Sequence, residues 1–213
     1  MAHRSPIRRV VDPLSPDPRS IGEAVRFLLE GKLVAYPTDT LYGLGADPRC
    51  AGAVEHLFRA KRRAPTEGIP LIAADVLQIE ACLGRLSRLG RRLADVFWPG
   101  PLTMVIAAGS GLNPRVRGEQ ASVAVRVPDY AIARELAAEL GHPLTATSAN
   151  VSGQAAATTA DEAVKALDSE LAMVLDGGPT GAVHSTIIDV RNATPVLLRA
   201  GVVPWDRVLQ SLA

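Results

Sequence analysis

The sequence predicts a single α/β domain with a mixed β-sheet flanked by helices. Short apolar runs of strand length alternate with amphipathic segments of helical period along most of the chain. The 213 residues contain no internal repeat and no change of composition that would divide the core region. A chain of this length can bury a sizeable core as one unit, so the three observations together favour the α/β class.

The N-terminal segment differs from the rest of the chain. Residues 1–19 are rich in proline and charge and lack apolar periodicity, which predicts a flexible tail. The folded domain is then expected over residues 20–213. Ser20 and Glu23 form a capping box ahead of an apolar helical pattern, and Gly31 ends that first helix.

The remaining elements follow from periodicity and from stop signals. Strands are predicted at Leu33–Tyr36, Pro70–Ala74, Leu102–Ala107, Ser122–Val127, Leu144–Thr147, Leu171–Asp176, Ser185–Val190 and Val196–Arg199. Helices are predicted from near Pro48 to Lys61, after Asp75, at Leu86–Trp98 and Asp129–Leu140, from a capping box at Thr159 to near Leu167, and near Pro204.

Composition excludes several classes of protein. The chain is 47% hydrophobic and 21% charged and has no apolar run of about 18 residues, so no membrane span or membrane partner is expected. No apolar stretch of signal-peptide length follows the basic start, which predicts a cytoplasmic location. A net charge of +1 argues against general coating of nucleic acid. The two cysteines and four histidines show no metal-ligand spacing, so no protein-held metal site is predicted.

A rare lysine lies in a compact basic motif, Lys61-x-Arg63, at the end of a predicted helix. An ammonium beside a planar guanidinium can hold a polyphosphate, one as a point charge and the other as a bidentate fork. The two side chains converge only if the chain leaves helical geometry, which Ala64–Pro65 favours. The alternative is a solvated basic helix end that offsets the helix dipole.

Three further segments carry polar groups at strand ends or within strands. The loop beginning Ser148-Ala149-Asn150 offers hydroxyl and amide groups for ribose or phosphate oxygens; the alternative is a plain turn. Thr38-Asp39-Thr40 follows a strand, where ligands of α/β sheets tend to bind, although a plain turn or cap is the alternative. Arg126 lies in an otherwise apolar strand and needs an anion, either a structural carboxylate or a ligand's.

The common nucleotide and hydrolase motifs are missing. The chain has no GxxxxGK[ST] loop, no GxGxxG after a strand and no GxSxG elbow. A nucleotide, if bound, is therefore held by a different kind of binding site.

Taken in order, the motifs resemble the YrdC/Sua5 family of threonylcarbamoyl-AMP synthases in its short single-domain form. The matching segments span most of the chain from Gly31 to Gly201: Gly31–Leu44, Lys61-x-Arg63, Phe97–Thr103, Ser122–Pro128, Ser148–Gly153, Ser185–Asp189 and Leu198-Arg199-x-Gly201. The resemblance implies a twisted α/β sheet with a concave basic groove. It also implies synthesis of L-threonylcarbamoyladenylate and pyrophosphate from L-threonine, bicarbonate and ATP, for modification of tRNA beside the anticodon.

The same resemblance implies roles for individual residues. Thr40, Arg126, Ser148 and Ser185 resemble the threonine-binding positions. Lys61, Arg63, Ser122, Asn150, Thr158 and Arg199 resemble the ATP-binding positions, and Lys61 and Arg63 are the expected catalytic residues. Mg²⁺ is expected to be carried on the ATP phosphates rather than by the protein. Replacing Lys61 or Arg63 by alanine should abolish activity with little loss of fold.

The resemblance also predicts partners for the chain, and two alternative functions stay open. The labile product must pass to downstream proteins that transfer the threonylcarbamoyl group to tRNA, and weak RNA binding by the chain itself is left open. Two other functions remain: a non-catalytic RNA-binding or ribosome-associated module that uses the same groove, and a paralogue that makes another carbamoyl- or acyl-adenylate. RNA binding that depends on salt, without ATP turnover, would favour the module.

Overall fold

The computed structural model describes residues 5–63, 68–109, 112–117 and 121–213. The strands are β1 (Ile7–Val10), β2 (Leu33–Tyr36), β3 (Gly43–Gly45), β4 (Leu71–Ile72), β5 (Leu102–Ala107), β6 (Ser122–Arg126), β7 (Leu144–Thr145), β8 (Thr147–Ser148), β9 (Leu171–Asp176), β10 (Thr186–Asp189) and β11 (Val196–Arg199). The helices are α1 (Pro18–Leu29), α2 (Ala51–Lys61), α3 (Val76–Cys82), α4 (Arg88–Phe97), α5 (Ala131–Leu140), α6 (Ala160–Leu167), a 3-10 turn (Asp168–Glu170) and α7 (Trp205–Gln210).

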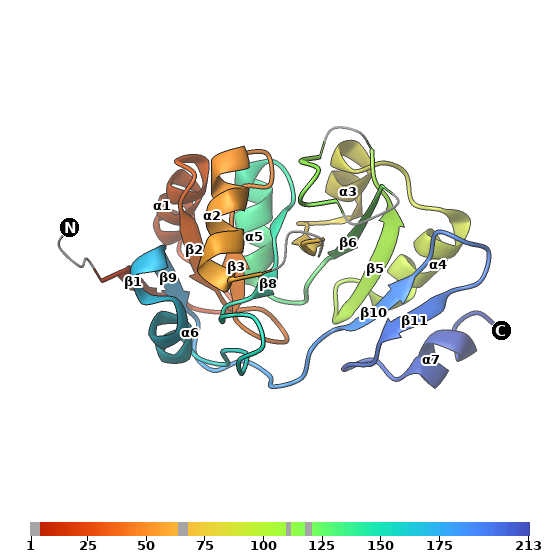
Figure 1. Cartoon of the computed structure of the whole chain (residues 1–213). Coiled ribbons are helices and arrows are strands. Elements are labelled where there is room, and N and C mark those ends of the chain that lie inside the picture. The colour runs from red at the N-terminus through yellow and green to blue at the C-terminus, as the bar shows by residue number, and fades with distance from the viewer. Residues whose placement is uncertain (1–4, 64–67, 110–111, 118–120) are drawn as a thin grey trace.

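The predicted α/β class is confirmed, but the strands form two sheets instead of one. One sheet has the order β1-β9-β2-β3-β8, and the other has the order β11-β10-β5-β6-β4-β7. Both combine parallel and antiparallel pairs. Figure 1 shows the two sheets in separate halves of the molecule, each with its own helices.

Strand alternation explains how helices cover the five-stranded sheet. In β2, Val34 and Tyr36 belong to the core that contains α1 and α5, whereas Leu33 and Ala35 belong to the core that contains α2 and α6. Successive side chains of a strand point to opposite faces, so a fully apolar strand can be buried on both sides. The run Leu33–Tyr36 therefore lies between two helical layers, and all four of its residues are buried.

The expected N-terminal tail is wrong for the described residues of that segment. Residues 7–10 form β1, which pairs in parallel with β9, and α1 begins at Pro18 with Asp17 as its N-cap in place of Ser20. Most side chains of β1 remain exposed, so the strand lacks the apolar pattern that would reveal it in the sequence. Its partner is more than 160 residues away, and residues 1–4 lie outside the described residues.

The strand predicted at Leu144–Thr147 is divided between the two sheets. Residues 144–145 form β7 in the six-stranded sheet, and residues 147–148 form β8 in the five-stranded sheet. The Tyr36 hydroxyl donates to the Thr145 carbonyl at 2.8 Å, and the Thr145 hydroxyl bridges Ala46 and Leu44 across the junction. The chain thus crosses from one sheet to the other immediately before the Ser-Ala-Asn loop.

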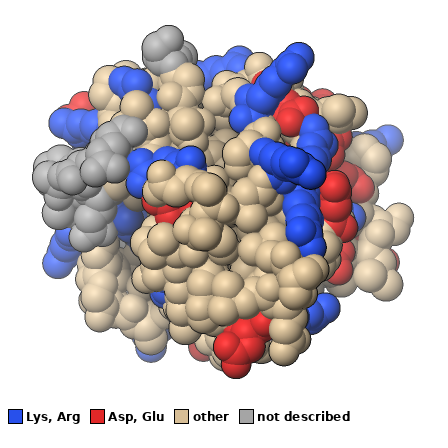
Figure 2. Space-filling model, turned by 90° about the vertical axis from the view of Figure 1, so that its right-hand side faces the viewer, with Lys and Arg blue, Asp and Glu red and all other residues tan. Residues whose placement is uncertain are grey.

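The surface carries charges of both signs. Figure 2 shows the side of the molecule that bears α4 and α7, where basic and acidic side chains lie next to one another. Within the described part of the chain, no helix is both long enough and apolar enough to cross a membrane.

Candidate active site between the two sheets

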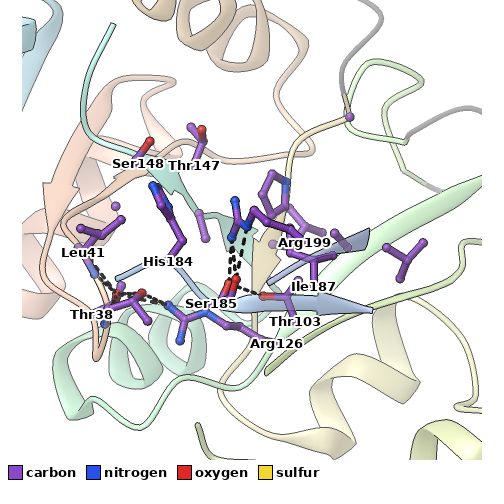
Figure 3. A pocket seen from close by; sticks show the side chains of 18 of the residues that line it. Thr38, Leu41, Thr103, Arg126, Thr147, Ser148, His184, Ser185, Ile187 and Arg199 are labelled. Carbon is purple, nitrogen blue, oxygen red and sulfur yellow. Dashed lines mark hydrogen bonds between the residues drawn. The ribbon is translucent and has the colours of Figure 1, made fainter. Parts of the chain in front are cut away.

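A cavity of ≈ 380 Å³ lies between the two sheets. Alternate residues of three neighbouring strands of the six-stranded sheet form one wall, and the intervening residues, such as Met104 and Val125, are buried in the core. The opposite wall comes from the ends of β2, β3 and β8, and Figure 3 shows several of the side chains that meet there. The wall residues of β5, β6 and β10 are Thr103 and Val105, Ala124 and Arg126, and Ile187, with Ser185 directly before β10.

Arg126 is anchored to the loop that follows β2. Its guanidinium forms an ion pair with Asp39 and donates to the hydroxyls of Thr38 at 3.1 Å and Thr40 at 2.9 Å. Arg126 is buried, and Asp39 is the compensating carboxylate that such an arginine requires. The structure therefore provides the salt bridge that the sequence left as one of two alternatives, while Arg126 and Thr40 still line the cavity.

A second hydrogen-bonded group lies across the cavity wall from Arg126. The Ser185 hydroxyl lies 2.8 Å from the Thr103 hydroxyl and accepts from the Arg199 guanidinium at 3.2 Å. Arg199 also donates to the Ser185 carbonyl at 2.9 Å. Figure 3 shows these three side chains joined by hydrogen bonds at the cavity wall.

Lys61 fastens the end of α2 to the Ser-Ala-Asn loop. Its ammonium donates to the carbonyls of Ser148 at 2.6 Å and Asn150 at 2.7 Å, and the lysine is only 2% exposed. The Ser148 hydroxyl donates to the Asn150 side-chain oxygen at 2.5 Å, and the Asn150 amide donates to the Gln154 carbonyl. The loop is therefore a closed hydrogen-bonded unit whose shape depends on a buried cation.

The chain leaves helical geometry immediately after Lys61. Arg62 adopts a left-handed conformation with φ of 50°, and the Arg63 amide bonds back to Phe58, which ends the helix. The expected exit at Ala64–Pro65 lies outside the described residues. Arg63 is thereby turned toward the cavity, where its guanidinium donates to the Gly68 carbonyl at 3.0 Å.

A second cavity of ≈ 320 Å³ adjoins the first. Arg63, Ser148 and His184 line both cavities, so the two spaces share a boundary. Lys61, Asn150 and the small residues of the Ser-Ala-Asn loop complete the second one. Small side chains leave room for a ligand to approach the loop backbone closely.

Electrostatics make the combined space suitable for an anion. Among the described residues that line the two cavities, none is acidic, whereas Lys61, Arg63, Arg126 and Arg199 are basic. Loss of water around its guanidinium and the nearby charge of Arg126 both lower the pKa of Arg199. The like charges of Arg126 and Arg199 repel each other, and an anion placed between them would relieve this repulsion. Burial, followed by the charge of Arg199, lowers the pKa of His184, which favours a neutral imidazole at pH 7.

Most of the residues predicted from the sequence meet at these cavities. Within the described part of the chain, the cavity walls contain Thr40, Lys61, Arg63, Arg126, Ser148, Asn150, Ser185 and Arg199, but not Ser122 or Thr158.

The two exceptions have visible reasons. Ser122 lies on the cavity face of β6 by alternation with Ala124 and Arg126, but at the far end of the strand. The Thr158 hydroxyl lies 2.9 Å from Glu162 at the start of α6. The Thr158 hydroxyl therefore takes part in the hydrogen bonding at the N-terminus of α6 instead of lining a cavity.

Three residues of the site were not predicted. In the sequence Asp39 is only part of a polar loop, Thr103 only the end of a motif, and His184 only one of four scattered histidines. Thr103 and Val105 are two residues apart on β5 and therefore point to the same face. This alternation is the sequence signal that could have placed Thr103 on the cavity wall. No group of three or more His, Cys, Asp or Glu side chains suited to a metal ion occurs in residues 5–63, 68–109, 112–117 and 121–213.

The chain matches one family model and is similar to several threonylcarbamoyl-AMP synthases. Residues 26–201 match the Sua5/YciO/YrdC family model, which is described as telomere recombination. A threonylcarbamoyl-AMP synthase of Vibrio vulnificus is 40% identical over 186 residues, which cover 85% of this chain and 98% of that protein. A threonylcarbamoyl-AMP synthase of Bacillus subtilis is 37% identical over 201 residues, which cover 93% of this chain and 58% of that protein.

The fold matches a solved structure over almost its whole length. The crystal structure of Pyrococcus abyssi Sua5 complexed with L-threonine superposes with a TM-score of 0.91 at 35% identity, covering 97% of this chain and 61% of that one. The chain thus spans somewhat more than half the length of the Bacillus and Pyrococcus relatives.

Proposed function

Because this chain belongs to the Sua5/YciO/YrdC family, we propose that it is an L-threonylcarbamoyladenylate synthase, a nucleotidyltransferase that makes threonylcarbamoyl-AMP and pyrophosphate from L-threonine, bicarbonate and ATP. The observation that carries the proposal is the pair of adjoining cavities. One has hydroxyls around a paired arginine, and the other has a lysine, an arginine and a loop of small residues. An amino acid in the first and a triphosphate in the second would meet at their shared boundary.

The first cavity has the polar groups that an amino acid needs. We assign L-threonine to the wall formed by Thr40, Arg126, Ser148 and Ser185, which supplies a guanidinium for its carboxylate and hydroxyls for its polar atoms. The Pyrococcus abyssi Sua5 structure, which is complexed with L-threonine, supports this assignment by its similarity. The apolar neighbours, such as Val105 and Ala124, suit the threonine methyl group.

The second cavity has the groups that a nucleotide triphosphate needs. We assign ATP to Lys61, Arg63 and Asn150 of the second cavity and to Arg199 of the adjoining first cavity, with the small residues of the Ser-Ala-Asn loop close to the phosphate oxygens. Ser122 and Thr158 stay predictions for this ligand. The phosphates would carry Mg²⁺, which supplies charge neutralisation at the leaving pyrophosphate. The phosphates themselves suit Mg²⁺ as oxygen ligands, and the basic walls would hold the remaining negative charge.

The reaction needs positioning more than side-chain acid–base chemistry. The threonine amine adds to CO₂ derived from bicarbonate and loses a proton, which gives a carbamate. A carbamate oxygen then attacks the α-phosphorus in line, and the bond to pyrophosphate breaks. Arg63 and Arg199 would stabilise the charge that shifts to the leaving oxygens, and Lys61 would keep the Ser-Ala-Asn loop in place.

The product is a mixed anhydride and is therefore short-lived in water. We propose that the enzyme works in the cytoplasm beside proteins that transfer the threonylcarbamoyl group to tRNA. Bicarbonate, threonine and ATP are all available there.

The test is pyrophosphate release by the purified chain with ATP, Mg²⁺ and bicarbonate, measured with and without L-threonine. Release that requires both threonine and bicarbonate is expected. Release with another amine in place of threonine would instead support a paralogue with a different donor. No release, together with absence of ATP binding and presence of salt-dependent RNA binding, would overturn the proposal in favour of an RNA-binding module.

A further inference from the structure

We propose that Thr103 is a positioning residue, which fixes the Ser185 hydroxyl so that its proton points to the carboxylate of the amino-acid substrate. The inference rests on the proposed function, because it concerns the same threonine cavity. Thr103 is 3% exposed and Ser185 is 8% exposed, and both belong to the cavity wall.

The pairing of two strands fixes the distance between the two hydroxyls. β5 and β10 run in parallel with Thr186 opposite Leu102 and Ile187 opposite Thr103. The Thr186 amide also bonds to the Pro101 carbonyl at 3.1 Å, which extends the ladder by one step. Because side chains alternate along a strand, residues 103, 185 and 187 share the cavity face. The 2.8 Å contact between the hydroxyls is therefore set by backbone register.

Counting donors and acceptors gives the direction of this hydrogen bond. Arg199 has only donors, so the Ser185 oxygen must accept from it. Among the described residues, the Thr103 hydroxyl has one hydrogen-bond partner, the Ser185 oxygen. If Ser185 donated to Thr103, the Thr103 proton would have no acceptor among the described residues, which is costly for a hydroxyl that is only 3% exposed, whereas Ser185 at 8% has the better access to the cavity. Thr103 is thus the donor, and Ser185 accepts from both neighbours.

This direction leaves one proton unassigned inside the cavity. A serine hydroxyl has one donor and two acceptor positions, and both acceptor positions are occupied by Thr103 and Arg199. The Ser185 proton must therefore point away from them, toward the open space that it lines. Figure 3 shows Ser185 between Thr103 and Arg199 at that wall. A carboxylate oxygen is the acceptor in the proposed substrate that best matches such a donor.

The experiment compares Thr103→Val with Thr103→Ser. Valine keeps the shape and removes the hydroxyl, whereas serine keeps the hydroxyl and removes the methyl group. We expect Thr103→Val to raise the KM for threonine about tenfold with kcat little changed, because the lost bond acts on binding. Thr103→Ser should stay within about twofold of the original KM. Thr194→Val, in the exposed β10–β11 turn, is the matched control.

A double-variant cycle separates positioning from structure. In a Ser185→Ala background, Thr103→Val should not weaken threonine binding further, as measured by calorimetry, because its partner is gone. Equal losses in Thr103→Val and Thr103→Ser, or additive losses in the cycle, would overturn the proposal. If valine prevents folding, Thr103→Ala replaces it in both comparisons. Failure of the unaltered chain to release pyrophosphate would instead count against the proposed function.

Discussion

At the scale of single residues, the site depends on two charges that are held differently. Lys61 is buried and donates to carbonyls of the Ser-Ala-Asn loop, whereas Arg63 lies at the boundary of both cavities. The sequence predicts one polyphosphate clamp in which the lysine is a point charge and the arginine a bidentate fork. The structure gives the lysine an additional task, because the loop cannot keep its shape without a donor for those carbonyls.

This difference leads to a prediction for the two alanine variants. Arg63→Ala should lower pyrophosphate release by about a hundredfold or more, with little change in stability. Lys61→Ala should lose activity and also about 2–4 kcal/mol of stability, because buried carbonyls lose a charged donor. Urea unfolding and pyrophosphate release measure the two effects. Lys165→Ala, on α6, is the control, and equal stability of Lys61→Ala and the unaltered chain would contradict the role given to Lys61.

At the scale of elements, β1 shows how a segment with little apolar pattern can still be ordered. Arg8 donates to Asp176 at 2.6 Å and to Asp161 at 2.6 Å, so β1 is tied both to the end of β9 and to α6. Burial by itself would raise the pKa of Asp176, but hydrogen bonds from Arg8 and from the Gly178 amide lower it below its ordinary value of 3.8. Asp176 is thus more stable as a carboxylate in the folded chain.

The pKa of Asp176 predicts how stability depends on pH. A carboxyl group whose folded pKa is lowered stabilises the fold fully above its unfolded pKa, and this contribution is lost as the pH falls through the folded value. The urea concentration at the unfolding midpoint should therefore decrease when the pH is lowered below about 4. Arg8→Ala should have a slightly lower midpoint at pH 7 and a shallower fall in acid. Arg59→Ala, exposed on α2, should follow the unaltered chain, and an unchanged acid response of Arg8→Ala would contradict the prediction.

The start of α6 gives a second prediction at this scale. Thr159 caps the helix by accepting from the Glu162 amide at 3.2 Å, while the Glu162 carboxylate accepts from the Thr158 amide at 2.7 Å. The second bond goes to the residue before the cap, which differs from the reciprocal pair that the sequence predicted. Thr159→Ala should cost about 1 kcal/mol in chemical denaturation. Thr159→Ser should restore that stability, and a loss equal to that of alanine would show that the hydroxyl is not the cap.

At the scale of the whole molecule, the candidate site lies where two sheets face each other. Each wall belongs to a different sheet, and the chain crosses between them at residues 145–147. A ligand in the cavities would contact both halves at once. Its binding energy would then stabilise the whole domain instead of one loop.

Ligand binding should therefore raise the unfolding temperature of the whole domain. ATP with Mg²⁺, or L-threonine, at about a hundred times its Kd should add about 2.7 kcal/mol to the stability of the folded state. Differential scanning calorimetry should show one transition that moves upward with either ligand. The shift with ATP should disappear in Arg63→Ala while the shift with threonine remains. Movement of only part of a divided transition would contradict a site shared by both sheets.

The sequence by itself determined the α/β class, most strands and helices, and the motif residues of the candidate site. These follow from local physics: strands such as Leu102–Ala107 and Leu171–Asp176 carry their own apolar pattern, and Asp75 caps α3 as predicted. Eight of the ten residues expected at the site also line its cavities, because they lie in ordered motifs at strand ends.

Only the tertiary structure decided which distant groups meet. The division into two sheets, the β1–β9 pair, the Asp39–Arg126 ion pair and the Thr103–Ser185 contact all join residues that are far apart in the chain. Neither partner of such a pair has a sequence signal that names the other, since the pairing energy depends on position in space. The use of the Thr158 hydroxyl in the cap of α6, and the burial of Lys61, were decided in the same way.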